Sequence, residues 1–548
     1  MKLSGANKEL IAEGARNVHS NRWRAAAPRN FQPSCQFKTG SPAPRPSPHR
    51  MGRGWPAGRA RGGSWAGNRS QYAAKVLTES GSSPRGQRCS LSPGERARVR
   101  GSEAPPRTGE RGSVLIIVLW IAFGLVSLAL YFAHSMSFEL RAADNRVASV
   151  EAEEAIAGAA RYVSNVLANV QQPGTLPDTN TYRFAAVPVG DATFWLIGRG
   201  DDQNPPTTAH FGLMDEASKL NLNTATTNML LALPRMTPEL AANIISWRSS
   251  ANSNPSRGAE SETYMRLNPP YLCKNAPFET VDELRLVYGA YLDILYGEDV
   301  NLNGVLDPNE NDGDVSPPSD DQNGRLDPGI LEYVTVYSHE PSTTTNGTAR
   351  VNVGDLGNPA QAAQLRSLLQ NAGVANPNLI LARTTTPPSV TSVLEFYIRS
   401  GMSADDFAKI EVGVRNPTVD GLLNVNTASA SVLACIFAGA GVDTNQAVSL
   451  VAYRQSQASR LTSIAWVKGV LDAPTARRAG PWLTGKTFQF TADLAAVGHY
   501  GRGYRRVKYI FDTSDGAPKV LYRQDLTHMG WALGKQARDA LFLAKALR

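Results

Sequence analysis

The sequence predicts an α+β fold in which one long N-terminal helix packs on an antiparallel sheet that a large helical insertion interrupts. Three observations support this prediction. An uncharged apolar run at 114–132 continues into a helix-forming segment. Strand-like segments occur in two groups, at 182–197 and 483–525. The long stretch between these groups is rich in short helical patterns, so it is expected to be a separate helical region.

The apolar run VLIIVLWIAFGLVSLALYF has the length of a membrane span, because about 20 helical residues cross the hydrocarbon of a bilayer. No residue between Arg111 and Glu139 carries a formal charge. In lipid, a helix satisfies every backbone polar group within the segment itself. The residues that follow are rich in Ala, Glu, Arg and Leu, which form helices well, and Pro173-Gly174 then breaks the pattern. We expect one helix over 113–172 with its first third in a membrane.

The positive charge is concentrated before this helix. Residues 1–112 hold 21 Lys and Arg against 6 Asp and Glu, a net +15, so the remaining residues carry −7 of the chain's +8. Upstream positive charge keeps that side of the membrane in the cytoplasm, which places the body outside it. The basic segment lacks apolar periodicity and is expected to be disordered. It is either upstream sequence included by a misassigned start, an extended leader, or an arm that binds nucleic acid or anionic lipid.

Strand-forming residues and turns mark the two parts of the sheet. In the first part, Gly190-Asp191 separates two runs of aromatic and β-branched residues, which predicts a hairpin. The second part contains TFQFTADLAAVG, GYRRVKYIFDT and KVLYRQDL, three antiparallel strands expected to join that hairpin. The chain therefore divides into the basic segment at 1–112, the helix at 113–172, sheet at 173–215, helical modules at 216–340 and 341–482, and sheet at 483–548.

The helical region contains an internal repeat. The sequence LNLNTA at 220–225 recurs as LNVNTA at 423–428, and each copy precedes a helical pattern, a turn and a second helix ending in Trp-Arg or Tyr-Arg. This order is typical of helix-hairpin-helix or SAM-like modules. Such modules often bind the nucleic-acid backbone, but the acidic body opposes phosphate binding. We favour modules that contact protein, and keep a membrane-anchored DNA-binding or DNA-uptake protein as the alternative.

A calcium-loop pattern lies in the first module. Residues 299–310 fit D-x-[DN]-x-[DN]-G-x₅-E at every fixed position. Ca²⁺ prefers six to eight oxygen ligands, which this spacing brings to one point. The expected ligands are the side chains of Asp299, Asn301, Asn303, Asp307 and Glu310 and the carbonyl of Val305.

A second, incomplete copy of the loop follows, with Ile330 in place of the closing acid. This copy and the stretch between the two loops add further candidate ligands, namely Asp312, Asp314, Asp321, Asn323 and Asp327. We expect one or two Ca²⁺ ions, and the alternative is a solvated acidic loop without metal.

No pattern of catalytic residues stands out. The sequence contains no H-E-x-x-H, no G-x-S-x-G and no P-loop, and its seven histidines are scattered. We therefore expect a protein that is not an enzyme. Outside the basic segment the cysteines are Cys273 and Cys435, which either pair in an oxidising compartment or stay as two separate buried thiols.

Several sequence features together resemble one family, the minor pseudopilin K of the type II secretion system. They are Arg111-Gly112-Ser113 before the apolar helix, MDEASKLNLNTA, GRLDPGILEYVTVYS, LLNVNTAS and the tail QDLTHMGWALG. The resemblance implies a pilin-like domain with a calcium-binding helical insertion. It also implies a prepilin leader that is cut between Gly112 and Ser113, with methylation of the new N-terminus.

The same resemblance implies a place and partners. The protein would be a single-pass protein of the inner membrane with its body in the periplasm, at the tip of the pseudopilus. Its partners would be minor pseudopilins of the I and J types, with secreted substrates as further partners and no nucleic acid. Most proteins with such a leader have Glu fifth after the cut, where this chain has Ile117. That Glu normally pairs with the N-terminus of the subunit ahead, so a subunit with none ahead would not need it.

Overall fold

The structure is a computed structural model, and it describes residues 113–200, 209–250, 253, 257–457, 459 and 461–546. The basic segment at 1–112, with Gly112 of the expected cut, lies outside the described residues.

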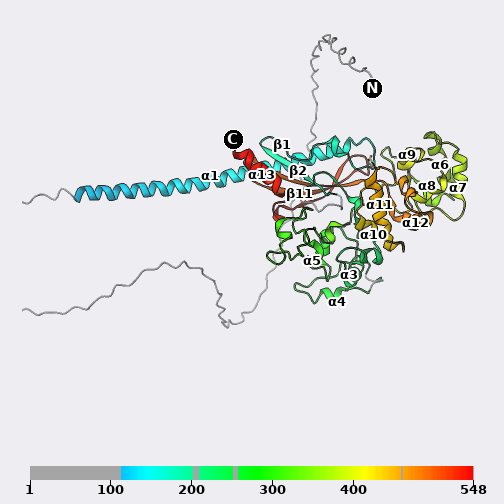
Figure 1. Cartoon of the computed structure of the whole chain (residues 1–548), viewed down its shortest axis with the longest axis horizontal. Helices are drawn as coiled ribbons and strands as arrows, with labels where there is room; N and C mark the ends of the chain where they lie inside the picture. The colour runs from blue at the N-terminus through cyan, green and yellow to red at the C-terminus, as the bar shows by residue number, and fades with distance from the viewer. Residues whose placement is uncertain are drawn as a thin grey trace, which may run out of the picture. The chain divides into compact units, whose positions relative to one another are not determined.

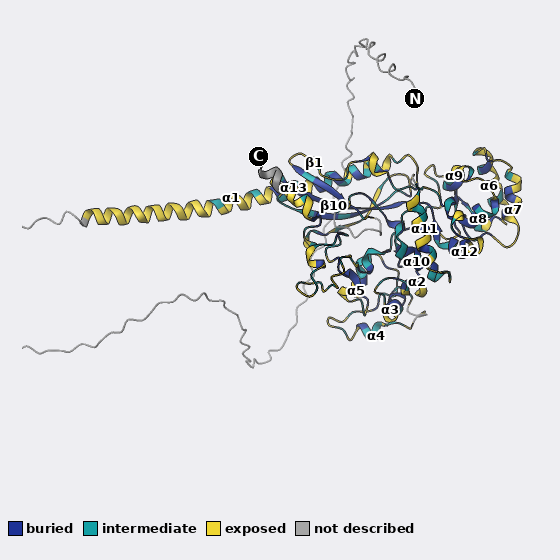
Figure 2. Ribbon diagram, viewed as in Figure 1, coloured by how far each residue is buried: buried dark blue, intermediate teal, exposed yellow. Residues whose placement is uncertain are grey.

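The first element is a single long helix, α1 (Ser113–Ala168), of 56 residues. Its apolar residues from Val114 to Leu140 are exposed, and it is the one helix of the described chain that is long and apolar enough to cross a membrane. From Ala148 onward, buried residues recur every three or four positions and form one stripe: Ala148, Ala152, Ala155, Ile156, Ala159, Val163 and Leu167. This spacing marks one face of a helix, and Figure 2 shows the change from an exposed half to a half that reaches the body.

The helix packs on a six-stranded sheet in which every pairing is antiparallel. The strands are β1 (Val187–Val189), β2 (Ala192–Ile197), β3 (Met214–Asp215), β10 (Gln489–Val497), β11 (Arg505–Asp512) and β12 (Lys519–Asp525). Their order is β1-β2-β10-β11-β12, and β3 also pairs with β10. In the register of β2 and β10, Leu196 lies opposite Leu494. The early hairpin and the late strands therefore form one sheet, and the predicted α+β fold is confirmed (Figure 1).

Both faces of the sheet are covered at its centre. Phe194, Leu196, Phe490, Leu494 and Phe511 pack with the buried stripe of α1. On the other face, Trp195, Ile197 and Val497 pack with Ala532 and Leu533, which directly precede the last helix, α13 (Gly534–Ala546). All nine residues of β10 are consequently buried.

The insertion between β3 and β10 is helical, as expected. Its helices are α2 (Thr227–Leu231), α3 (Pro238–Arg248), α4 (Ser261–Tyr264), α5 (Leu292–Tyr296), α6 (Pro359–Asn371), α7 (Pro377–Thr385), α8 (Val393–Ser400), α9 (Ala404–Ile410), α10 (Ala430–Gly439), α11 (Asn445–Ser456) and α12 (Ala473–Ala479). They share one large apolar cluster.

Three short parallel strand pairs close loops of the insertion. They are β4 (Leu220–Asn221) with β5 (Val334–Thr335), β6 (Val351–Asn352) with β7 (Val414–Arg415), and β8 (Leu423–Asn424) with β9 (Leu483–Thr484). The segment LEYVTVYS contributes only the two residues of β5 to a strand. A 3-10 turn at Ile330–Glu332 comes just before it and shortens the extended stretch.

The repeat in the sequence is also a repeat in structure. Arg248, at the end of α3, donates hydrogen bonds to the carbonyls of Leu222 and Ala225 in the first copy. Arg454, in α11, donates to the carbonyls of Val425 and Ala428 in the second copy, at 3.1 and 2.8 Å. The arginine of each Trp-Arg or Tyr-Arg pair thus binds the turn of its own LNxNTA motif. Assignment of the two copies to the helix-hairpin-helix or SAM-like class stays a prediction.

Two buried acids join the insertion to the sheet. Asp215 accepts hydrogen bonds from Asn424 Nδ2 at 2.8 Å and from the hydroxyls of Thr427 and Thr487. Glu216 accepts from the hydroxyls of Thr335 and Thr491. Because their partners come from the second repeat copy, from β5 and from the segment that includes β10, these two carboxylates hold the insertion in place on the sheet.

Cys273 and Cys435 are free and buried, so these two cysteines are separate thiols and do not pair with each other. Burial raises the pKa of the Cys435 thiol to about 12.

Candidate metal centre

The loop that carries the calcium-binding pattern follows α5. Hydrogen bonds from its backbone N–H groups to its own side-chain oxygens fix its conformation. Asp299 accepts from the N–H of Asn303 at 2.9 Å and from the N–H of Gly304 at 2.8 Å. Asn303 Oδ1 accepts from the N–H of Val305 at 2.6 Å. Gly304 has φ +68°, a conformation that glycine adopts without strain, so the loop turns sharply at this position.

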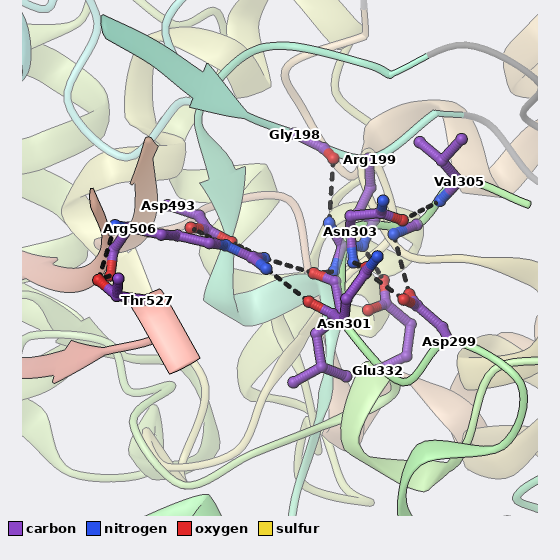
Figure 3. A network of polar contacts seen from close by, with 12 residues as sticks. Gly198, Arg199, Asp299, Asn301, Asn303, Val305, Glu332, Asp493, Arg506 and Thr527 are labelled. Atoms are coloured by element: carbon purple, nitrogen blue, oxygen red, sulfur yellow. Dashed lines mark hydrogen bonds and ion pairs between the residues drawn. The ribbon is translucent and has the colours of Figure 1, made fainter. Parts of the chain in front are cut away.

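The acid at position nine of the loop gathers the other side chains. Asp307 Oδ2 accepts from Asn301 Nδ2 at 2.7 Å and from Asn303 Nδ2 at 3.0 Å. The N–H of Asp307 donates to Glu310 Oε2 at 3.0 Å. The structure thus brings the five predicted side-chain ligands of the first loop into one network, part of which Figure 3 shows.

Most of this network is buried. Asp299, Asn303 and Glu310 are each only 1% exposed. Among the described residues, Glu310 Oε1 has no hydrogen-bond partner although it is buried. Burial, helped by the nearby charges of Asp299 and Asp307, raises the pKa of Glu310 to about 8. Burial also raises the pKa of Asp299, which the charge of Arg199 partly opposes.

This arrangement fits a bound cation. Its donors are carboxylate, amide and carbonyl oxygens, which hard cations such as Ca²⁺ prefer. Buried carboxylates that lie together without a compensating charge are unfavourable, and a cation would remove that cost. The Glu310 oxygen without a partner is the observation that most favours a ligand here.

A second cluster of acids lies beside the first loop. Glu298, Asp321 and Asp327 each place one oxygen within 4.8 Å of the other two, and no other such trio of Asp, Glu, His or Cys occurs in the described residues. Glu298 is buried and accepts from the N–H of Asp327 at 2.9 Å, and Arg235 lies 3.6 Å from its other oxygen. Asn323 donates to Asp321 Oδ2 at 2.8 Å, so this amide also lies at the cluster.

The remaining candidates are placed differently. Asp312 accepts from the hydroxyl of Ser316 at 2.6 Å within a local turn, and Asp314 is exposed. Neither belongs to the trio of Glu298, Asp321 and Asp327. Sequence reasoning missed Glu298, because it stands one residue before the loop pattern.

Two arginines hold the first loop from the side of the sheet. Arg506, in β11, donates to the carbonyls of Asn301 and Leu302, the latter at 2.6 Å. Arg199, which follows β2, donates to the carbonyl of Leu302 at 3.0 Å and to Glu332 Oε1 at 2.8 Å. Figure 3 shows both guanidinium groups reaching the loop, a contact that the sequence analysis did not anticipate.

Comparison with known proteins places part of the chain in a family. Residues 214–295 match the model of the family described as type II secretion system (T2SS), protein K. This segment begins at β3 and includes the first repeat copy with α2 and α3, and it ends in α5, just before the metal loop. No curated protein matches the chain.

Five chains of solved structures match. One comes from the crystal structure of the GspK-GspI-GspJ complex of the type 2 secretion system of enterotoxigenic Escherichia coli. It has 12% sequence identity and a TM-score of 0.34, and the match covers 68% of this chain and 93% of that chain. A TM-score of this size supports no conclusion about this chain. The family match over 214–295 agrees with the family that the sequence resembles, and it covers this segment of the chain.

Proposed function

We propose that the protein is a minor pseudopilin at the tip of the type II secretion pseudopilus, where it starts or caps assembly and supports protein export across the outer membrane. The family match at 214–295 carries this proposal. The form of α1 supports it as well. The first half of this helix is apolar and exposed, and the second half packs on an antiparallel sheet through one buried face.

The two halves of α1 suit a subunit that is anchored before it is assembled. The apolar half has no buried residue in its most apolar window, so it needs lipid or neighbouring apolar helices around it. The positive charge before it favours a cytoplasmic N-terminal side, which puts the body in the periplasm. At the tip no subunit lies ahead, and the apolar Ile117 at the fifth place after the expected cut is consistent with that position.

The body would contact other minor pseudopilins of the I and J types and, through them, the pseudopilus. The helical insertion is the proposed contact region because it exposes large apolar side chains, including Met265, Leu272, Tyr291 and Leu292, each more than half exposed. Secreted substrates are proposed as further partners. The role is structural, without catalysis.

We further propose that Ca²⁺ binds the first loop through Asp299, Asn301, Asn303, Asp307, Glu310 and the carbonyl of Val305. The trio of Glu298, Asp321 and Asp327 would hold a second ion. A bound ion would supply positive charge among the buried carboxylates, and would so stabilise the folded conformation of the loop.

The proposal is tested by producing the full chain in membranes together with I-type and J-type minor pseudopilins and purifying it in detergent. A complex with both partners at fixed stoichiometry, without retained DNA, is expected. Salt-dependent DNA binding without partner association would favour the alternative, a membrane-anchored DNA-binding or DNA-uptake protein. Failure to associate with either pseudopilin would contradict the proposed function.

A further inference from the structure

Arg506 occupies an unusual position for a charged residue. It lies in β11, and its side chain is completely buried. Its guanidinium donates to both carboxylate oxygens of Asp493 in β10, at 3.0 and 2.6 Å. The same group donates to the carbonyls of Asn301 and Leu302. One planar group therefore joins two strands of the sheet to a loop whose contacted residues lie 205 and 204 positions earlier in the sequence.

The two carbonyls lie in the part of the loop that presents the ligands. Asn301 is itself an expected ligand, and Leu302 stands between it and Asn303. Leu302 has φ +52°, a conformation that residues other than glycine adopt uncommonly. A strained conformation persists only where the surroundings hold it. Arg506 and Arg199 both donate hydrogen bonds to the carbonyl of Leu302, and these bonds stabilise the conformation.

The charges around these arginines are balanced. Arg506 pairs with Asp493, and Arg199 pairs with Glu332, so each guanidinium has a carboxylate partner of its own. An unbalanced positive charge near a cation site would repel the ion. The pairs instead supply rigid hydrogen-bond donors to the loop with little net charge, which suits residues that orient ligands without competing with the ion.

We propose that Arg506 is a positioning residue for the cation loop, and that its pair with Asp493 links cation binding in the insertion to the stability of the β10–β11 pair. This inference rests on the proposed binding of Ca²⁺. Linkage between two sites is reciprocal. If the sheet holds the loop in its binding conformation, an ion in the loop must in turn stabilise the two strands that carry Asp493 and Arg506.

The test compares Ca²⁺ binding by the full chain in detergent with that of Arg506→Met, by calorimetric titration after the metal has been removed. Loss of an outer-shell partner of a metal ligand typically weakens binding about 10–100-fold, and we expect a loss in this range. A purely electrostatic role predicts the opposite sign, because removal of a positive charge would tighten cation binding. Arg505→Met is the matched control, since it removes the same charge from the adjacent position of β11, whose side chain points to the other face.

A second measurement follows hydrogen exchange of the backbone amides at 489–512. Added Ca²⁺ should slow this exchange in the wild-type protein and in Arg505→Met, but not in Arg506→Met. If Arg506→Met does not fold, Arg199→Met replaces it, because Arg199 is partly exposed and its loss leaves the Arg506–Asp493 pair intact. That variant is expected to bind Ca²⁺ more weakly than the wild type.

The outcomes separate the two proposals. If the wild-type protein binds no Ca²⁺, the proposed metal function is wrong, and the positioning role fails with it. If the wild-type protein binds Ca²⁺ and the arginine variant binds it equally or more tightly, the metal site stands and the positioning role is overturned.

Discussion

Replacement of Glu310 by Gln should stabilise the metal-free protein at neutral pH and remove the stabilisation that Ca²⁺ confers through the first loop. Glu310 is 1% exposed, and one of its oxygens has no partner among the described residues. Glutamine has nearly the same shape but cannot ionise. The substitution therefore removes the buried charge while it keeps most of the packing.

The magnitude follows from the pKa of Glu310, which is raised from 4.5 to about 8. A carboxyl group with a raised pKa binds its proton more tightly in the folded state than in the unfolded chain. Its contribution to stability is complete below pH 4.5 and is lost as the pH rises to about 8. At about 1.4 kcal/mol per pH unit, the metal-free protein loses on the order of 3 kcal/mol between pH 4.5 and 7. Glu310→Gln avoids this loss.

The assay is thermal unfolding of the full chain in excess chelator at several pH values between 5 and 8, repeated with Ca²⁺. In chelator, the variant should unfold at a higher temperature than the wild type, by a margin that grows with pH. Ca²⁺ should raise the midpoint of the wild type more than that of the variant. Glu279→Gln is the control, because that side chain is 83% exposed. A margin that does not change with pH would refute the buried-charge reasoning. An undiminished rise of the variant's midpoint with Ca²⁺ would show that the loop is not the site.

Two further predictions concern contacts between segments that are distant in the sequence. Gly421→Ala should destabilise the protein by on the order of 1–3 kcal/mol, since Gly421 has φ +71° and the added Cβ would lie 1.9 Å from Thr224 Oγ1. Chemical unfolding measures this loss of stability, and Gly469→Ala is the control because a Cβ added at Gly469 would meet no atom within 4 Å. Equal losses of stability in the two variants would contradict the prediction. Hydrogen bonds from the backbone and ring of His499 lower the pKa of Glu151, so this group adds stability above its ordinary pKa of 4.5 that is lost as the pH falls. As the pH falls from 6 to 3, the thermal midpoint should therefore fall more for the wild type than for Glu151→Gln. Equal falls in the two proteins would contradict this prediction.

Local sequence preferences were enough to predict the long helix and the hairpin. The helix expected at 113–172 is observed at Ser113–Ala168, and the turn expected at Gly190-Asp191 separates β1 from β2. Both features depend on residues that are neighbours in the chain. Apolar content, helix propensity and turn residues report such short-range preferences directly.

Pairings over long distances in the sequence were harder to foresee. The two-residue strands β4 and β5 pair in parallel, although more than a hundred positions separate them. Two residues give no readable strand pattern, and strand propensity depends strongly on context. The hydroxyl of Thr335 on β5 binds the buried Glu216, a contact that exists only once the insertion has folded against the sheet.

The metal centre shows the same limit. The spacing of the loop pattern was enough to bring Asp299, Asn303 and Glu310 together, because a short loop sets their geometry. Glu298 reaches its cluster because Asp321 and Asp327 fold back beside it, which no fixed motif describes. Arg506 looks in the sequence like an ordinary basic residue of an alternating strand, and only the insertion packed over it makes it buried.

The N-terminal residue of the mature protein, determined on material extracted from the membrane fraction, tests the central claim most directly. If α1 is the processed anchor of a pseudopilin, the mature chain begins at Ser113 and fractionates with the inner membrane. A mature chain that begins far from Ser113, or protein recovered without the membrane, would contradict the account.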